Sequence, residues 1–183
     1  MSRSFAKALN IEDVGDATLI ASDLFQASFN SAFPAPREFQ LGADLVKKSA
    51  WHQYVARYTH IDGAVECIGF CNWIRYADKC GDVYLEGGMC VKKNFYRSLP
   101  KAEFLECKAR GGVAQMIMET AAHDLDDAAA WFGYCGDHMA YRVDQRVGFQ
   151  PTTHQHLIVK WMCDLDDGAK NALIESIAKL GPF

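Results

Sequence analysis

The stretch Gly111-Gly112-Val113-Ala114-Gln115-Met116-Ile117-Met118-Glu119-Thr120-Ala121-Ala122-His123 joins two glycines directly to an apolar helical pattern. Val113, Ile117 and Ala121 are four residues apart, which puts them on one face of an α-helix. Glycines at a helix start leave the first backbone N–H groups open, and the positive end of the helix dipole attracts anions. The stretch therefore predicts a phosphate site or, as the plainer alternative, a loop before a core helix.

Composition favours one globular domain spanning residues 1–183, because the chain is 50% hydrophobic and 23% charged. The formal net charge of −4 argues against nucleic acid as a partner. No apolar run approaches the roughly 20 residues that span a bilayer, and the N-terminus lacks the apolar core of a signal peptide. Seven cysteines without a CxxC pair argue against a disulfide framework or a zinc site. We expect a reduced, cytoplasmic protein.

The first third of the chain predicts one strand and two helices before a sheet begins. Residues 5–12 form a short strand, and residues 17–29 carry a helical stripe of apolar side chains. Residues 37–49 predict a second helix. From residue 51 the apolar period changes to two, and the stretches 52–60, 65–76 and 83–91 predict an antiparallel meander.

A glycine pair and a long connection stand out in and after the third strand of the meander. Gly87 and Gly88 lie inside the third strand of the meander, where glycines often mark a bulge or the approach of a ligand. The connection 92–110 is long and predicts a short helix over 100–108. After the helix that ends near residue 125, we expect a strand (128–135), a helix (138–147, capped by Gly136 or Asp137), a strand (156–162) and a terminal helix (169–180).

Two motifs and the order of elements resemble one known family. The pattern Q/R-x-x-G-x-G/A ends here as Gly112-Val113-Ala114, while its first position falls on Ala109, with Arg110 beside it. The pattern N-x-x-A-x-x-x-Y-x-x-x-G-F corresponds to residues 137–149, where Ala140, Gly148 and Phe149 match, Asp137 replaces Asn and Asp144 replaces Tyr. On these residues, and on the element order over roughly residues 5–162, the chain resembles the GNAT superfamily of acyl-CoA-dependent N-acyltransferases.

The resemblance implies a fold, a cofactor and a reaction. The implied fold is α/β (α+β), with a central mixed, mostly antiparallel sheet flanked by helices on both faces. The implied reaction transfers an acetyl group from acetyl-CoA to the primary amine of a small molecule or to a protein amino group, by direct attack and without a metal. The residues expected to bind coenzyme A are Met89, Cys90, Val91, Arg110, Gly111, Gly112, Val113, Ala114, Asp137 and Asp144.

Catalysis needs a base, an oxyanion donor and an acid for the leaving thiolate. Glu86 is the candidate base, with a solvated or salt-bridged strand carboxylate as the alternative. The N–H of Met89 or Cys90 is the candidate oxyanion donor. Asp144 stands in the position of the acid, yet an aspartate of ordinary pKa is ionised at pH 7. We therefore expect either Tyr141 or a water molecule to act as the acid. The alternative for Tyr141 is that its side chain only packs against its neighbours.

The remaining candidates concern the acceptor, the cofactor phosphate and partners. Trp73 and Tyr84 line the acceptor pocket or pack in the core. Lys92, Lys93 and Arg97 attract a phosphate or remain solvated charges. The connection 92–110 is a lid, a wall of the acceptor site or a contact with another subunit, and the chain is a possible homodimer.

Two other functions remain open at this point. A coenzyme A-binding module without turnover, acting as a sensor or scaffold, fits Asp144 and Ala109 at their unusual positions. O-acyl transfer, or transfer from an acyl carrier protein, fits the basic residues at 92–97.

Overall fold

Seven strands form the central sheet, in the order β1-β4-β5-β6-β7-β9-β8. The computed structural model describes residues 3–183. Every neighbouring pair in this sheet is antiparallel except β6–β7, which is parallel. The sheet is thus mixed and mostly antiparallel, as expected. The strands are β1 (Leu9–Asp13), β4 (Trp51–Thr59), β5 (Val65–Asp78), β6 (Gly81–Val91), β7 (Ala130–Tyr134), β8 (Gln150–Pro151) and β9 (Leu157–Trp161).

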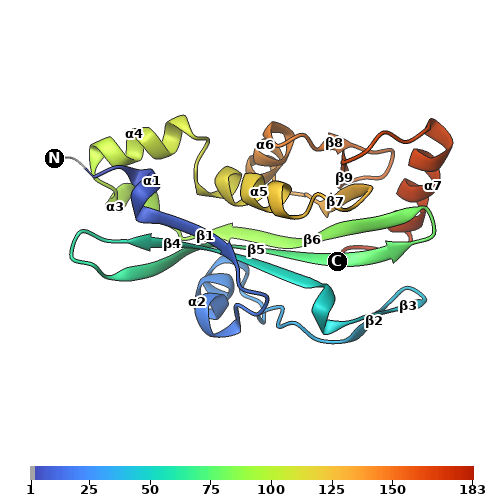
Figure 1. Cartoon of the computed structure of the whole chain (residues 1–183), viewed down its shortest axis with the longest axis horizontal. Coiled ribbons are helices and arrows are strands. Elements are labelled where there is room, and N and C mark those ends of the chain that lie inside the picture. The colour runs from blue at the N-terminus through green and yellow to red at the C-terminus, as the bar shows by residue number, and fades with distance from the viewer. Residues whose placement is uncertain (1–2) are drawn as a thin grey trace.

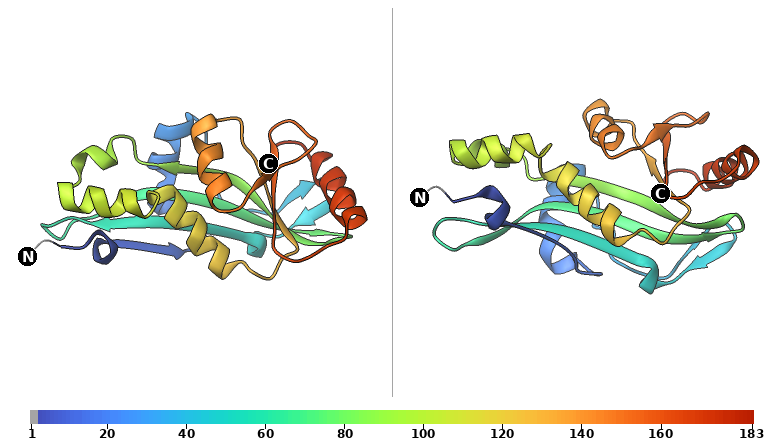
Figure 2. Two further views of the ribbon diagram at one scale, coloured as in Figure 1. Left: turned by 90° about the horizontal axis from the view of Figure 1, so that it is seen from above. Right: turned by 45° about the horizontal axis from the view of Figure 1, so that its top comes forward.

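Helices cover both faces of this sheet (Figures 1 and 2). The helices α5 (Val113–Asp124) and α6 (His138–Arg146) lie on one face, and α2 (Thr18–Phe29) lies on the other. The helix α7 (Asp167–Ala178) packs through Leu173 and Ile177 against buried β6 side chains. None of the helices within residues 3–183 is long and apolar enough to cross a bilayer.

The predicted bulge at the glycine pair of β6 is confirmed. The β5–β6 register pairs Trp73 with Glu86 and Cys71 with Met89, so Asn72 lies opposite both Gly87 and Gly88. A Cβ on Gly87 would lie 2.4 Å from the Asn72 amide nitrogen, and Gly88 has φ +116°. Gly87 therefore provides the space that the Asn72 side chain occupies, and Gly88 provides a backbone conformation that other residues rarely adopt.

Two expectations for the first third of the chain are wrong. Residues 5–12 do not form one strand, because α1 (Phe5–Ala8) precedes β1. Residues 37–49 form no α-helix: they contain the hairpin of β2 (Phe39–Leu41) and β3 (Asp44–Val46), followed by the 3₁₀ turn η1 (Lys48–Ala50). Gly42, with φ +60°, allows the turn between the two short strands.

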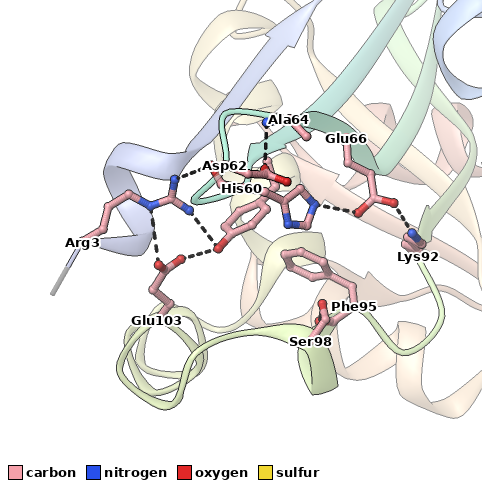
Figure 3. A network of polar contacts seen from close by, with 10 residues as sticks. Arg3, His60, Asp62, Ala64, Glu66, Lys92, Phe95, Ser98 and Glu103 are labelled. Atoms are coloured by element: carbon pink, nitrogen blue, oxygen red, sulfur yellow. Dashed lines mark hydrogen bonds and ion pairs between the residues drawn. The ribbon is translucent and has the colours of Figure 1, made fainter.

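The long connection between β6 and α5 folds into α3 (Phe95–Ser98) and α4 (Lys101–Ala109). The Glu106 carboxylate on α4 accepts hydrogen bonds from Ser4 Oγ and from the N–H groups of Phe5 and Ala6, at 2.7–3.0 Å. Buried Glu103 accepts a hydrogen bond from Tyr58 Oη at 2.5 Å and lies 3.5 Å from Arg3 Nε (Figure 3). The N-terminal segment thus holds this connection against the sheet.

Candidate cofactor groove and active site

The strands β6 and β7 separate after a short parallel pairing. Their register runs from Val83–Ala130 to Glu86–Gly133 and stops there, so residues 87–91 of β6 pair with β5 alone. The backbone groups of these residues on the β7 side are therefore free of a strand partner. A gap of this kind accepts an extended ligand that hydrogen-bonds to a strand edge.

A groove of about 1150 Å³ occupies this opening. Side chains from α2 on one face of the sheet and from α5 and α6 on the other line the same groove, which requires the sheet to be open between them. Apolar residues supply much of its wall, including Leu24, Phe29 and Met139. Five of the residues predicted to bind coenzyme A line it, namely Met89, Cys90, Val91, Ala114 and Asp137.

The start of α5 offers fewer free donors than the sequence predicted. The N–H of Gly111 donates to the Lys108 carbonyl at 3.1 Å, and the N–H of Gly112 donates to the Cys107 carbonyl at 3.0 Å, because α4 runs almost directly into α5. Within residues 3–183, no hydrogen bond is formed by the N–H of Ala114 or of Gln115. The free donors at this end therefore lie at Ala114 and Gln115, within the first turn of α5, and not at the two glycines.

Tyr96 in α3 occupies a third donor at this helix end, the N–H of Val113. Its hydroxyl accepts a hydrogen bond from the Val113 N–H at 3.1 Å, and its side chain lines the groove. A Cβ on Gly112 would lie 3.2 Å from the same hydroxyl, and Gly112 has φ +92°. The sequence analysis missed Tyr96, because its contact with α5 depends on how the connection folds back.

The basic residues at 92–97 do not act as one patch. Lys92 forms an ion pair with Glu66, which also lies 3.2 Å from His60 Nε2 (Figure 3). Lys93 lines the groove, forms no ion pair within residues 3–183, and leaves its charge available to an anion. Arg97 is exposed and does not line the groove.

Arg110, Gly111 and Val113, which were also predicted to bind the cofactor, lie outside the groove, whereas Asp137 lines it. Arg110 and Gly111 line a separate depression of about 920 Å³ beside α5. The Val113 side chain is fully buried in the core. Asp137 caps α6 by accepting hydrogen bonds from the N–H groups of Met139 and Ala140, at 2.8 and 2.9 Å. These hydrogen bonds lower the pKa of Asp137, so its carboxylate stays ionised at the end of the groove.

Glu86 lies at the last paired position before the strands separate. Its carboxylate lies over Gly133, where a Cβ would be 3.0 Å from Glu86 Oε2. Burial, and secondarily the Asp144 carboxylate, raises the pKa of Glu86 to about 8. Within residues 3–183 the Glu86 carboxylate forms no ion pair, so the salt-bridged alternative is wrong. Glu86 does not line the groove itself.

Asp144 does not have the ordinary pKa that the sequence analysis assumed. Asp144 lies on α6 and is 2% exposed. Burial raises the pKa of its carboxyl group to about 6, and a hydrogen bond with Cys135 acts in the opposite direction. Its Oδ1 atom is buried and has no hydrogen-bond partner within residues 3–183. Asp144 therefore contacts the core beneath α6 and not the groove.

The thiol of Cys90 lines the groove but is not poised as a nucleophile. Its residue is 7% exposed, and burial raises the pKa of the thiol to about 11. A thiol in this state is almost entirely protonated at neutral pH. The role left for Cys90 is the backbone role predicted from the sequence.

A second pocket of about 410 Å³ adjoins the groove at Asp137, which lines both. Tyr141 and His138 from α6 contribute to its wall, together with Ile158 from β9. The Ile158 Cγ1 atom lies 3.5 Å from the position of a Cβ on Gly133, where the Glu86 carboxylate also lies. Ile158 therefore connects the wall of this pocket to the neighbourhood of Glu86.

The two aromatic residues predicted to line the acceptor pocket are core residues instead. Trp73 is 0% exposed and packs against Trp131, with ring centroids 4.4 Å apart and the ring planes tilted by 50°. Tyr84 is 2% exposed, and its hydroxyl donates to Asp127 at 2.9 Å. Neither side chain contacts the groove or the second pocket. Among residues 3–183, no group of three or more His, Cys, Asp or Glu side chains is arranged to hold a metal ion.

Comparison with known proteins gives matches at the level of structure alone. No family model matches the sequence, and no curated protein matches it. A GCN5-related glucosamine N-acetyltransferase region of a fungal multi-domain β-N-acetylglucosaminidase matches with a TM-score of 0.52 and 10% identity, over 84% of this chain and 18% of that one. The KacTA–DNA complex matches with a TM-score of 0.46 and 11% identity, over 91% and 99% of the two chains.

Tetrahymena GCN5 also matches, with a TM-score of 0.40 and 12% identity, over 69% of this chain and 75% of that one. The glucosamine N-acetyltransferase region has a TM-score above one half, so its likeness to this chain shows a shared fold. The helix that begins at Val113 lies where the sequence pattern predicted it. The chain has the fold of this GCN5-related (GNAT) region.

Proposed function

We propose that the protein is an acyl-CoA-dependent N-acyltransferase that transfers an acetyl group from acetyl-CoA to a primary amine. The single observation that carries this proposal is the groove of about 1150 Å³ through the opening between β6 and β7. Both the free strand edge at 89–91 and Ala114, at the start of α5, line this groove. The GNAT fold supports the same reading.

The residues of the groove suit the chemical parts of coenzyme A. The backbone groups of residues 89–91 that point away from β5 can hydrogen-bond to the two amides of the pantetheine arm, as an added strand would. The N–H groups of Ala114 and Gln115, at the positive end of α5, suit the pyrophosphate. Lys93 adds a positive charge for a further phosphate.

The acceptor amine enters through the second pocket, which meets the groove at Asp137 and approaches Glu86 at Gly133. Positioning the amine against the thioester supplies the main catalytic effect. Glu86, whose pKa is raised to about 8, is suited to take the amine proton at mildly alkaline pH. Tyr141 remains the candidate acid for the leaving thiolate, because it lines the acceptor pocket.

The test combines binding and turnover. Coenzyme A should bind in calorimetry, and acetyl-CoA with a panel of primary amines should release thiol. Ala114→Glu places a carboxylate in the groove at a helical position without backbone strain, and should weaken coenzyme A binding at least about tenfold, or about 1.4 kcal/mol. Ala102→Glu adds the same charge in the first turn of α4, outside the groove, and should leave binding unchanged. Equal affinity for both variants would contradict the proposed site.

A second candidate is a coenzyme A-binding module without turnover. The observation in its favour is that neither Glu86 nor Asp144 lines the groove. Calorimetric binding of coenzyme A, combined with no thiol release across the amine panel between pH 7 and 9, would favour the module. Partners, subcellular location and oligomeric state remain predictions, including the expectations that nucleic acid is not a partner and that a homodimer is possible.

A further inference from the structure

Two neighbouring lysines at one end of the groove differ in what they contact. Lys92 and Lys93 follow β6 and are the cationic side chains among the described residues that line the groove. Within residues 3–183 Lys93 forms no ion pair, whereas Lys92 forms one with Glu66, which also lines the groove. A phosphate that enters this end therefore meets one lysine that is free and one that is already neutralised.

The Glu66 carboxylate is held from two sides (Figure 3). Its Oε1 atom accepts a hydrogen bond from Lys92 Nζ, and its Oε2 atom lies 3.2 Å from His60 Nε2. The His60 imidazole in turn packs edge-on against the Tyr58 ring, with centroids 4.9 Å apart and ring planes at 88°. Because both carboxylate oxygens are engaged, Glu66 keeps a fixed position beside Lys92.

The same contacts keep Glu66 ionised. Burial raises the pKa of its carboxyl group, but the hydrogen bonds with Lys92 and His60 and the positive charge of Lys92 outweigh burial, so the pKa is lowered overall. The side chains of Glu66 and Lys92 are 31% and 45% exposed, so water and salt partly screen their charges. The pair is thus a charged pair whose effect on a ligand depends on ionic strength.

The end of the groove that holds this pair is the one suited to phosphate groups. The free strand edge at 89–91 leads directly into the two lysines, and Ala114 at the start of α5 lines the same groove. Tyr96 joins these parts, because it lines the groove and its hydroxyl accepts a hydrogen bond from the Val113 N–H. The positive end of the α5 dipole and the lysines therefore act on the same ligand groups.

We propose that Glu66 determines how strongly the groove binds phosphate, because it neutralises Lys92 and leaves Lys93 to attract the ligand. This inference rests on the proposed function for the identity of the ligand as coenzyme A, but not for the effect of Glu66 on a bound phosphate. Coenzyme A carries a 3′-phosphate in addition to its pyrophosphate, and dephospho-coenzyme A lacks it. With Lys92 held by Glu66, the groove gains less from this additional phosphate than two free lysines would give.

The first test measures, by calorimetry at low salt, the affinity of the full chain for coenzyme A and for dephospho-coenzyme A. Glu66→Gln keeps the size of the side chain but removes its charge and releases Lys92, so it should tighten coenzyme A binding about two- to fivefold, the range for one partly exposed charge. Dephospho-coenzyme A should gain less, so the ratio of the two affinities should rise. Lys92→Met should weaken coenzyme A binding, and the double variant should return close to the unaltered affinity.

Asp82→Asn is the matched control for this charge change. Asp82 lies at the other end of β6, pairs with Arg75 at 2.8 Å and does not line the groove, so its coenzyme A affinity should be unchanged. Raising the salt to about 0.5 M should reduce the gain in Glu66→Gln, because salt screens charges but does not reverse a change in groove shape. Unchanged or weaker coenzyme A binding by Glu66→Gln at low salt, or a gain of equal size at high salt, overturns the proposal.

An inorganic probe separates this inference from the proposed function. Pyrophosphate is titrated into the full chain without cofactor, and the lysine side-chain NMR resonances are followed, assigned through their loss in Lys92→Met and Lys93→Met. Lys93 should respond in the unaltered chain, and Lys92 should respond only after Glu66→Gln. An equal Lys92 response in both chains, or no pyrophosphate binding to either, overturns this inference. The expected lysine responses without coenzyme A binding would instead refute the proposed function alone.

Discussion

The Tyr96 hydroxyl accepts a hydrogen bond from the Val113 N–H at 3.1 Å, so the connection between β6 and α5 supplies a polar group at the start of the helix. Within residues 3–183 the phenolic proton of Tyr96 has no acceptor, which leaves it free to donate to an anion in the groove. The connection 92–110 contributes Lys92, Lys93 and Tyr96 to the wall of the groove. Its helix α4 is fixed to the N-terminal segment through Glu106 and Glu103.

Tyr96→Phe should weaken coenzyme A binding about three- to tenfold, the range for one hydrogen bond of about 0.5–1.5 kcal/mol. Calorimetry with coenzyme A measures the effect. Tyr134→Phe, which removes a hydroxyl outside the groove and the second pocket, is the matched control and should leave affinity unchanged. Tighter binding by Tyr96→Phe would mean that the hydroxyl competes with the phosphate for the Val113 N–H.

The pH dependence of turnover follows from Glu86. A base works in its ionised form, and the pKa of Glu86 is raised to about 8, so kcat/KM should rise with pH and level off above about pH 8. Glu86→Gln should remove this limb and lower the rate by about 10²- to 10⁴-fold. A limb near pH 4–5 in the unaltered enzyme would show that Glu86 is not the base.

The same pKa shift predicts a change in stability. Glu86 titrates near the ordinary value of 4.5 in the unfolded chain and at about 8 in the folded one, so folding is favoured below pH 4.5 and this contribution is lost as pH rises to about 8. Glu86→Gln removes the titrating group, so this loss of stability with rising pH should disappear in the variant. At pH 9 its free energy of unfolding should exceed that of the unaltered chain by about 2 kcal/mol or more, with little difference at pH 4.5. Urea unfolding at both pH values measures it.

The sequence predicted the elements that carry strong local patterns and missed those that depend on long-range contacts. The meander, the bulge at Gly87–Gly88, the helix from residue 113 and the Asp137 cap follow from alternation, glycine placement and capping chemistry. The prediction of a helix over residues 37–49 was wrong, because the apolar residues at 39, 41, 45 and 46 fit either a helix or two short strands. The hairpin is selected by the turn at Gly42 and by the Phe39–Trp51 contact.

Site residues were harder to predict for a related reason. Alternation along β6 places Tyr84 and Glu86 on one face, but it does not show that Tyr84 is covered by the segment carrying Asp127. The pKa of Asp144 depends on its burial under α6, and the donors at Gly111 and Gly112 are closed by α4. Each of these outcomes is set by packing between elements that the sequence pattern treats separately.

Cys90 provides a test of direct transfer against a covalent intermediate. Burial raises the pKa of its thiol to about 11, so iodoacetamide at pH 7.5 should modify the exposed Cys80 and Cys163 well before Cys90. Peptide mass spectrometry over a time course measures the order. Cys90→Ala should retain turnover, and an acetyl group trapped on Cys90 after incubation with acetyl-CoA would contradict direct attack.

The Tyr58–Glu103 hydrogen bond gives a prediction on stability that is independent of function. Tyr58 Oη donates to Glu103 at 2.5 Å, and both residues are buried, at 3% and 5% exposure. Tyr58→Phe leaves the carboxylate without this donor and should lower the free energy of unfolding by about 1–3 kcal/mol. Tyr134→Phe is the matched control, because its hydroxyl forms no hydrogen bond within residues 3–183, and it should change stability by less than about 0.5 kcal/mol. Equal stabilities of the two variants in urea would show that Arg3, 3.5 Å from Glu103, satisfies the carboxylate by itself.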